Sequence, residues 1–256
     1  CIGIIVCLGI HKIDLSFLKN RKTVLILYAI SIVSLLLLFV AGHVAKGAQS
    51  WIRLGFLSIQ PTDPAKLILI ILLAKYFSKR YVEISAFRHV LVSGLYTAIL
   101  GVLVLLQPDF GSAVTIFAIW LGMIFVSGIS KKHLVLLFLC ALFAFGFAWK
   151  FAFKDYQKKR IINFIHPLSD TRGSGYNQYQ ALIAIGSGEL LGKGVGYGTQ
   201  SKLRFLPEYQ TDFIIAAFAE EWGFVGLSIV LVLFGLMLTR MLYLAPRLSS
   251  NFEVLV

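Results

Sequence analysis

Asp212 is the acidic residue of this sequence whose position most strongly indicates chemistry. It lies in the run Phe205-Leu-Pro-Glu-Tyr-Gln-Thr-Asp-Phe-Ile214, where a polar loop re-enters an apolar segment, and Glu208 lies in the same run. An aspartate there could accept a proton from a hydroxyl group or position a cation that does so. The structural alternative is that Thr211 or Asp212 caps the helix that starts near Phe213.

Three cations occur close together in the first part of the chain. Lys46 and Arg53 lie in the run Lys46-Gly-Ala-Gln-Ser-Trp-Ile-Arg-Leu-Gly55, and Lys66 ends the run Ile59-Gln-Pro-Thr-Asp-Pro-Ala-Lys66. Cations grouped at one surface could bind an anionic headgroup through charge-assisted hydrogen bonds.

The alternative for these two runs is a plain interfacial loop. Trp51 would then lie at the level of the lipid headgroups. Thr62 or Asp63 would cap a helix that Pro64 opens at its first position. This alternative explains most of the residues, but it leaves the three cations without a role.

Asp109 lies in the short run Gln107-Pro-Asp-Phe-Gly-Ser-Ala113, which links two apolar segments. It would cap the second segment by accepting backbone N–H bonds, while Pro108 ends the first. It could also orient a substrate or a cation.

A long connection, residues 154–212, carries two further cations, Arg160 and Lys193. Its glycine-rich run Gly192-Lys-Gly-Val-Gly-Tyr-Gly198 is not a nucleotide-binding loop, because a P-loop requires Ser or Thr after the lysine. The glycines instead favour a chain that folds back tightly and exposes backbone N–H groups.

Composition identifies the elements that must position these residues. Hydrophobic residues make up 58% of the 256 residues and the mean hydropathy is +0.84, both well above soluble domains. The apolar segments are residues 23–42, 61–78, 91–107, 110–129, 134–153 and 213–239, with about half a span at 1–10. We predict an all-α polytopic membrane protein with about seven transmembrane helices, the first partial, forming a single transmembrane domain over 1–256.

The basic residues predict the orientation through the positive-inside rule. Cytoplasmic loops would hold Lys12, Lys19, Arg21, Lys22, Lys79, Arg80, Arg88, Lys131, Lys132, Arg240 and Arg247. Residues 154–212 then form one large extracytoplasmic loop, whose aromatic and aliphatic content predicts order. The net charge of +12 largely reflects this topology, so we expect no nucleic-acid partner. Cys1, Cys7 and Cys140 lie in apolar segments and indicate neither a disulfide framework nor a zinc site.

Several of these runs, in the same order, resemble the motifs of the SEDS family (RodA, FtsW and SpoVE). The run from Phe205 is similar to L-P-E-x-x-T-D-F-I, and the runs at Lys46 and Gln107 are similar to K/N-G-A-x-R-W-I-x-L-G and Q-P-D-L-G-T. The resemblance extends from about residue 46 to 226, with departures such as Ser50 in place of Arg, which puts one phosphate contact in doubt.

The resemblance implies an inverting glycosyltransferase that polymerises the polyprenyl-diphosphate precursor lipid II into peptidoglycan. Asp212 matches the catalytic aspartate, and Glu208 and Glu221 match acidic positions of its motif. Substrate would contact Lys46, Arg53, Lys66, Asp109, Arg160, Lys193 and Glu208. No metal site is predicted, although Mg²⁺ is left open by the oxygen ligands at Asp109, Glu208 and Asp212.

The same resemblance implies a place and a partner. The site would face outward from the bacterial cytoplasmic membrane, among membrane lipids, beside a class B penicillin-binding transpeptidase. The chain would be a fragment of a protein of about ten helices, and its role in elongation, division or sporulation stays open. Two alternatives remain: a lipid II transporter, which should carry charges at the membrane midplane, and a noncatalytic scaffold for the transpeptidase.

Overall fold

The computed structural model describes Gly3, Gly9 and residues 15–41, 43–45, 48–54, 57–78, 87–151, 153, 155–166, 170, 173, 175–203, 205–248 and 250–256. These residues fold as two compact units. The first comprises Cys1–Ala141 and Leu248–Val256, and the second comprises Leu142–Arg247.

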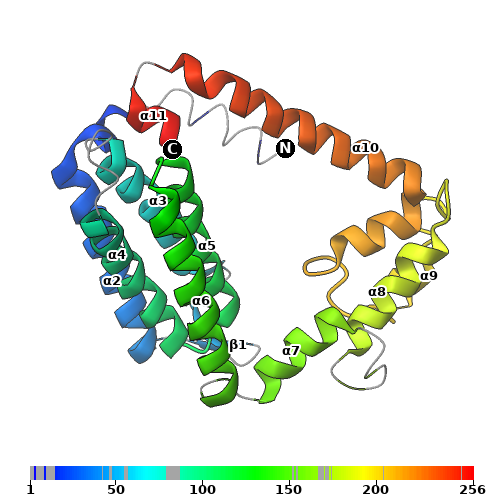
Figure 1. The fold of residues 1–256 in the computed structure, drawn as a ribbon. Coiled ribbons are helices and arrows are strands. Elements are labelled where there is room, and N and C mark those ends of the chain that lie inside the picture. Colours follow the sequence, from blue (N-terminus) through cyan, green and yellow to red (C-terminus); the bar gives the residue numbers. More distant parts are fainter. Residues whose placement is uncertain are drawn as a thin grey trace. The chain divides into compact units, whose positions relative to one another are not determined.

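The first unit is a bundle of apolar helices (Figure 1). Its helices are η1 (Leu15–Lys19), α2 (Arg21–Ala41), α3 (Thr62–Ser78), α4 (Phe87–Leu106), α5 (Phe110–Val126) and the short α11 (Asn251–Leu255). Leu35 of α2, Leu69 and Leu73 of α3, Leu100 of α4 and Ile116 of α5 have no exposed surface or almost none. Helix α3 contacts α2, α4 and α5, so it lies at the centre of the packing.

A small antiparallel sheet follows α2, where we expected only an interfacial loop. Strands β1 (His43–Ala45), β2 (Ala48–Leu54) and β3 (Leu57–Ile59) pair in that order. Such pairing satisfies the backbone hydrogen bonds of a segment that leaves a helix at the membrane boundary. Arg53 pairs with Ser58 along β2 and β3.

The described residues contain four helices that are long and apolar enough to cross a membrane. They are Arg21–Phe39, Phe87–Leu106, Lys132–Phe151 and Ile214–Arg247. Helices α3 and α5 are shorter, at 17 residues each, near the lower limit for a span. Apolar side chains on α6 (Lys131–Phe151), such as Phe143 and Phe151, are exposed, as a lipid-facing helix requires. The predicted all-α polytopic membrane fold is confirmed.

The second unit contains most of the long connection and the last long helix. Over its described residues the connection forms α7 (Asp155–Ile165), α8 (Tyr176–Ser187) and the one-turn α9 (Thr199–Lys202). It leads into α10 (Ile214–Leu244), which is followed by η2 (Ala245–Arg247). Helix α8 packs against α10, and α9 contacts both. The described residues of this connection are therefore folded, as its aromatic and aliphatic content led us to expect.

Helix α10 is interrupted at Gly223, whose φ of 67° and ψ of −169° are not helical. The helix therefore consists of two segments, 214–222 and 224–244. Backbone groups that would bond within an unbroken helix must find other partners at such an interruption, and residues 189–194 supply them, as described below.

Candidate functional site

The turn that carries Glu208 and Asp212 is fixed by a small apolar cluster. Leu206 is fully buried and packs with Ala181 and Ala184 of α8 and Ala216 of α10. Tyr209 and Phe213 are partly buried against the same cluster. The polar residues between these apolar ones are therefore held at the surface by a fixed backbone.

Glu208 adopts a left-handed conformation inside this turn, with φ of 54°. Its carbonyl oxygen accepts hydrogen bonds from the N–H groups of Thr211 at 3.1 Å and Phe213 at 3.2 Å. Its carboxylate accepts one from Thr211 Oγ1 at 3.0 Å. Positive φ is uncommon for a residue with a side chain and is often found at functional sites. Residues 206–211 line a hollow of about 310 Å³ beside it.

Asp212 is exposed and does not cap α10. The N-cap residue is Phe213, whose side chain accepts no hydrogen bond, and the helix begins at Ile214. The hydroxyl of Thr211 is turned toward Glu208 instead. The alternative in which Thr211 or Asp212 serves as the N-cap is therefore wrong, because the N-cap position is occupied by Phe213.

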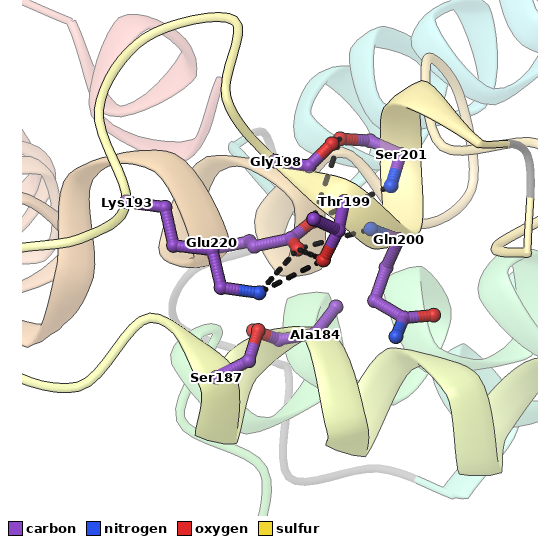
Figure 2. Close-up of polar contacts among 8 residues, drawn as sticks. All are labelled: Ala184, Ser187, Lys193, Gly198, Thr199, Gln200, Ser201 and Glu220. Atoms are coloured by element: carbon purple, nitrogen blue, oxygen red, sulfur yellow. Dashed lines mark hydrogen bonds and ion pairs between the residues drawn. The ribbon is translucent and has the colours of Figure 1, made fainter.

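Lys193, predicted to contact substrate, already has a carboxylate partner. Its ammonium Nζ lies 3.1 Å from Glu220 Oε1 and 2.9 Å from Thr199 Oγ1 (Figure 2). Its side chain is 31% exposed, so only part of its surface could meet a ligand. Arg160, the other cation predicted in this unit, is exposed on α7.

In the first unit, Asp109 connects its own run, residues 107–113, with the run of residues 59–66 that contains Gln60. It is the N-cap of α5, because its Oδ1 accepts a hydrogen bond from Ser112 N at 3.1 Å, as predicted. Its other oxygen, Oδ2, accepts a hydrogen bond from Gln60 Nε2 at 3.1 Å. Both carboxylate oxygens thus have protein partners.

Lys66 lies in the first turns of α3 and pairs with Asp63, with Nζ 3.1 Å from Oδ1. The helix begins at Thr62, so the expectation that Pro64 would open it is wrong by two residues. The hydroxyl of Thr62 is buried without a hydrogen-bond partner among the described residues, so it does not cap the helix. Lys46 and the side chain of Arg53 lie outside the described part of the chain.

Metal ligands do not gather in the parts of the chain that the structure describes. No group of three or more His, Cys, Asp or Glu side chains there could hold a metal ion. The arrangement therefore gives no basis for assigning Mg²⁺ to Asp109, Glu208 or Asp212.

Glu220 was not assigned to the site from the sequence. It is fully buried, and Lys193 and residues 199–201 surround its carboxylate. The signal was a glutamate inside an apolar helix, where an ionisable residue is costly and usually has a specific partner. The sequence spacing did not identify Lys193 as the partner of Glu220, since the two residues are 27 positions apart.

The whole chain, residues 1–256, matches the family model FTSW_RODA_SPOVE, described as cell cycle protein. The chain is 42% identical over 216 residues to the probable peptidoglycan glycosyltransferase FtsW of Haemophilus influenzae, covering 84% of this chain and 54% of that protein. It is 38% identical over 227 residues to the peptidoglycan glycosyltransferase MrdB of Escherichia coli, covering 88% and 61%. It is 36% identical over 255 residues to stage V sporulation protein E of Bacillus subtilis, covering 98% and 69%.

The chain thus spans 54% to 69% of the length of these relatives. Among solved structures, it resembles a chain from "Structural coordination of polymerization and crosslinking by a peptidoglycan synthase complex", with a TM-score of 0.78 and 29% identity over 99% of this chain and 69% of that one. It also resembles the crystal structure of the rod shape determining protein RodA of Thermus thermophilus, with a TM-score of 0.58 and 30% identity over 90% and 58% of the two chains. With its full-length family match and its apolar helices, this chain belongs to the FtsW, RodA and SpoVE family of multi-pass membrane proteins.

Proposed function

We propose that this protein polymerises lipid II into glycan strands at the outer face of the bacterial cytoplasmic membrane. Two of its relatives are named peptidoglycan glycosyltransferases, and the chain belongs to their family. The observation in the structure that best supports an enzymatic role concerns Asp212. It is an exposed carboxylate on a fixed turn, and the cap of the following helix does not use it.

The proposed reaction is a single displacement. The 4-hydroxyl oxygen of one sugar forms a bond to the anomeric carbon of another, and the bond from that carbon to the polyprenyl diphosphate breaks, leaving its electron pair on the diphosphate. Asp212 accepts the proton of the attacking hydroxyl as general base. Since the donor diphosphate is α-linked and the family product is β-linked, one displacement inverts the centre without a glycosyl-enzyme intermediate.

Positive charge must stabilise the departing diphosphate. We assign this role first to Lys46, Arg53 and Lys66, whose order along the chain resembles the family motif. Lys66 is paired with Asp63; the side chain of Lys66 is 20% exposed and that of Asp63 is 64% exposed. An ion pair with an exposed member contributes little free energy, so the ammonium could exchange Asp63 for a phosphate oxygen.

The remaining candidates would contact the sugar and peptide parts of the substrate. Arg160 is exposed on α7, and Glu208 is exposed beside the hollow formed by residues 206–211. Asp109 would orient a substrate group only by sharing an oxygen already bonded to Ser112 or Gln60. Lys193 shares its charge with Glu220, which weakens the case for direct contact with an anion.

Orientation and partner belong to the same proposal. The basic residues of the short loops support an extracytoplasmic position for the connection 154–212 under the positive-inside rule. A class B penicillin-binding transpeptidase as partner is supported by the related peptidoglycan synthase complex, in which polymerisation is coordinated with crosslinking.

The test is polymer formation by the full-length protein purified with and without its transpeptidase. Labelled lipid II should be converted to glycan strands that resolve on a gel, and a transpeptidase inhibitor should not prevent this. Transfer of lipid II across liposome membranes without polymer would favour the transporter. Absence of polymer and of transfer under all conditions would favour the scaffold.

A further inference from the structure

Glu220 of the second unit has a carboxylate whose two oxygens both accept hydrogen bonds. Its Oε1 accepts hydrogen bonds from Lys193 Nζ at 3.1 Å, Thr199 Oγ1 at 3.1 Å and Gln200 N at 3.0 Å (Figure 2). Its Oε2 accepts hydrogen bonds from Ser201 N at 3.3 Å and Ser201 Oγ at 3.4 Å. Its exposed fraction is 0%. Burying a carboxylate costs free energy unless it is paired and hydrogen-bonded, and here both oxygens are satisfied.

A second set of contacts holds the same two segments together at the interruption of α10. Backbone N–H groups on each side donate to carbonyl groups on the other: Lys193 to Glu220 at 3.0 Å, Gly194 to Glu221 at 3.0 Å, Phe224 to Glu189 at 2.9 Å and Val225 to Leu190 at 3.1 Å. A Cβ atom at Gly192 would overlap the carbonyl of Glu221, and one at Gly223 would overlap the backbone of Gly192. The approach of residues 189–194 to the interrupted helix is therefore close and specific.

The hydrogen bonds to the Glu220 carboxylate close residues 199–220 into a loop, and the backbone contacts fix residues 189–194 at its Glu220 end. The loop starts at the α9 residues that donate to Glu220, and it ends at Glu220 itself. Asp212 lies between these two ends. Inside the loop Leu206 N donates to Gln200 O at 3.1 Å, which ties the Asp212 turn to the bonded end.

We propose that Glu220 is a positioning residue for Asp212. Its carboxylate fixes residues 199–201 against α10 and thereby fixes the turn that presents Asp212 to substrate. Lys193 is its partly exposed counter-ion and contributes through this pair, in place of the direct diphosphate contact expected from the sequence. The catalytic part of this inference rests on the proposed function, whereas the anchoring part does not.

The test compares Glu220→Gln with Glu189→Gln in the full-length protein. The Glu220→Gln side chain keeps the shape of glutamate, but its NH2 group faces the N–H donors of residues 200 and 201. It also leaves Lys193 without a negatively charged partner. Hydrogen exchange of the amides of residues 199–213 should rise about tenfold or more, while exchange in α2 to α5 stays unchanged. Glu189 is exposed in the same region, so its variant removes the same charge and should match the unmodified protein.

Kinetics supply the second readout. With lipid II as substrate, Glu220→Gln should lower kcat about 10- to 100-fold, while KM changes less than about twofold, since misplacement of a base affects the transition state more than binding. The double variant Lys193→Met, Glu220→Gln should be no slower than the slower single variant, because the two residues act as one unit.

Three results would overturn the inference: unchanged exchange and kcat in Glu220→Gln, increased exchange throughout the chain, or losses that multiply in the double variant. The second of these would show a general structural role only. If local exchange rises as expected but Asp212→Asn polymerises normally, the anchoring stands and the catalytic assignment of Asp212 fails.

Discussion

Gln60 Nε2 donates a 3.1 Å hydrogen bond to Asp109 Oδ2, which joins segments 49 residues apart in the sequence. The other oxygen of Asp109 caps α5 through Ser112 N. One carboxylate therefore connects the start of α5 to the residues that lead into α3. Asp109 and Asp212 therefore differ in their structural roles: Asp109 caps α5, whereas Asp212 does not cap α10.

Asp109→Ala should lower stability by about 0.5–2 kcal/mol, since it removes the cap of α5. Asp109→Asn retains an oxygen that can accept from Ser112 N and should cost less, with a smaller loss of polymerisation than Asp212→Asn. Thermal unfolding in detergent checks the first part and polymer yield the second. An Asp109→Ala protein with an unchanged melting temperature would show that the cap contributes little.

The glycines where residues 189–194 meet α10 should not tolerate a side chain. Gly192→Ala should destabilise the protein by about 1–3 kcal/mol, because φ is 81° and the new Cβ would overlap Glu221. Gly146→Ala is the matched control, since nothing lies within 4 Å of a Cβ there. Melting temperatures of the two variants in the same detergent make the comparison. Equal values would contradict the close approach described at Gly223.

The cations of the first unit should act on substrate and not on folding. Lys66→Ala and Arg53→Ala should each weaken lipid II binding or turnover by about 1.5–3 kcal/mol, the range for a charge-assisted contact. Lys132→Ala, on the opposite side in the predicted topology, should leave turnover nearly unchanged. Similar losses in all three variants would indicate general instability in place of substrate contact.

Topology can be checked by labelling. In a protein whose three native cysteines are replaced, cysteine at the exposed positions Val195 or Gln210 should react with an impermeant thiol reagent applied to intact cells. Cysteine at Asn20, also exposed on its unit, should react only after lysis. Reaction of the Asn20 variant in intact cells would reverse the orientation.

Helices were predictable where composition alone decides them. The segment 61–78 corresponds to α3 (Thr62–Ser78) and the segment 110–129 to α5 (Phe110–Val126). Long, mainly apolar runs leave the chain no other way to satisfy its backbone in lipid. Strands β1 to β3 were missed because β1 and β3 have only three residues each, and because the stability of all three comes from pairing with one another, which local sequence does not display.

The parts of the site that depend on local sequence were predictable, whereas those that depend on tertiary contacts were not. The cap at Asp109 follows from a local rule, and the structure confirms it. The cap predicted at Thr211 or Asp212 follows from the same rule and is wrong, because α10 begins at Ile214 and its N-cap residue is Phe213. The pair Lys193 and Glu220 depends on how the long connection folds back on α10, so tertiary structure alone reveals it.

The most direct measurement of the central claim is the polymerisation rate of full-length Asp212→Asn with purified lipid II. Asparagine keeps the shape of the side chain but removes its charge and most of its basicity. If Asp212 is the general base, turnover should fall about 10²- to 10⁴-fold while expression, folding and lipid II binding persist. Normal polymerisation by a well-folded Asp212→Asn protein would contradict the catalytic role of Asp212 and direct attention to Glu208 and Asp109.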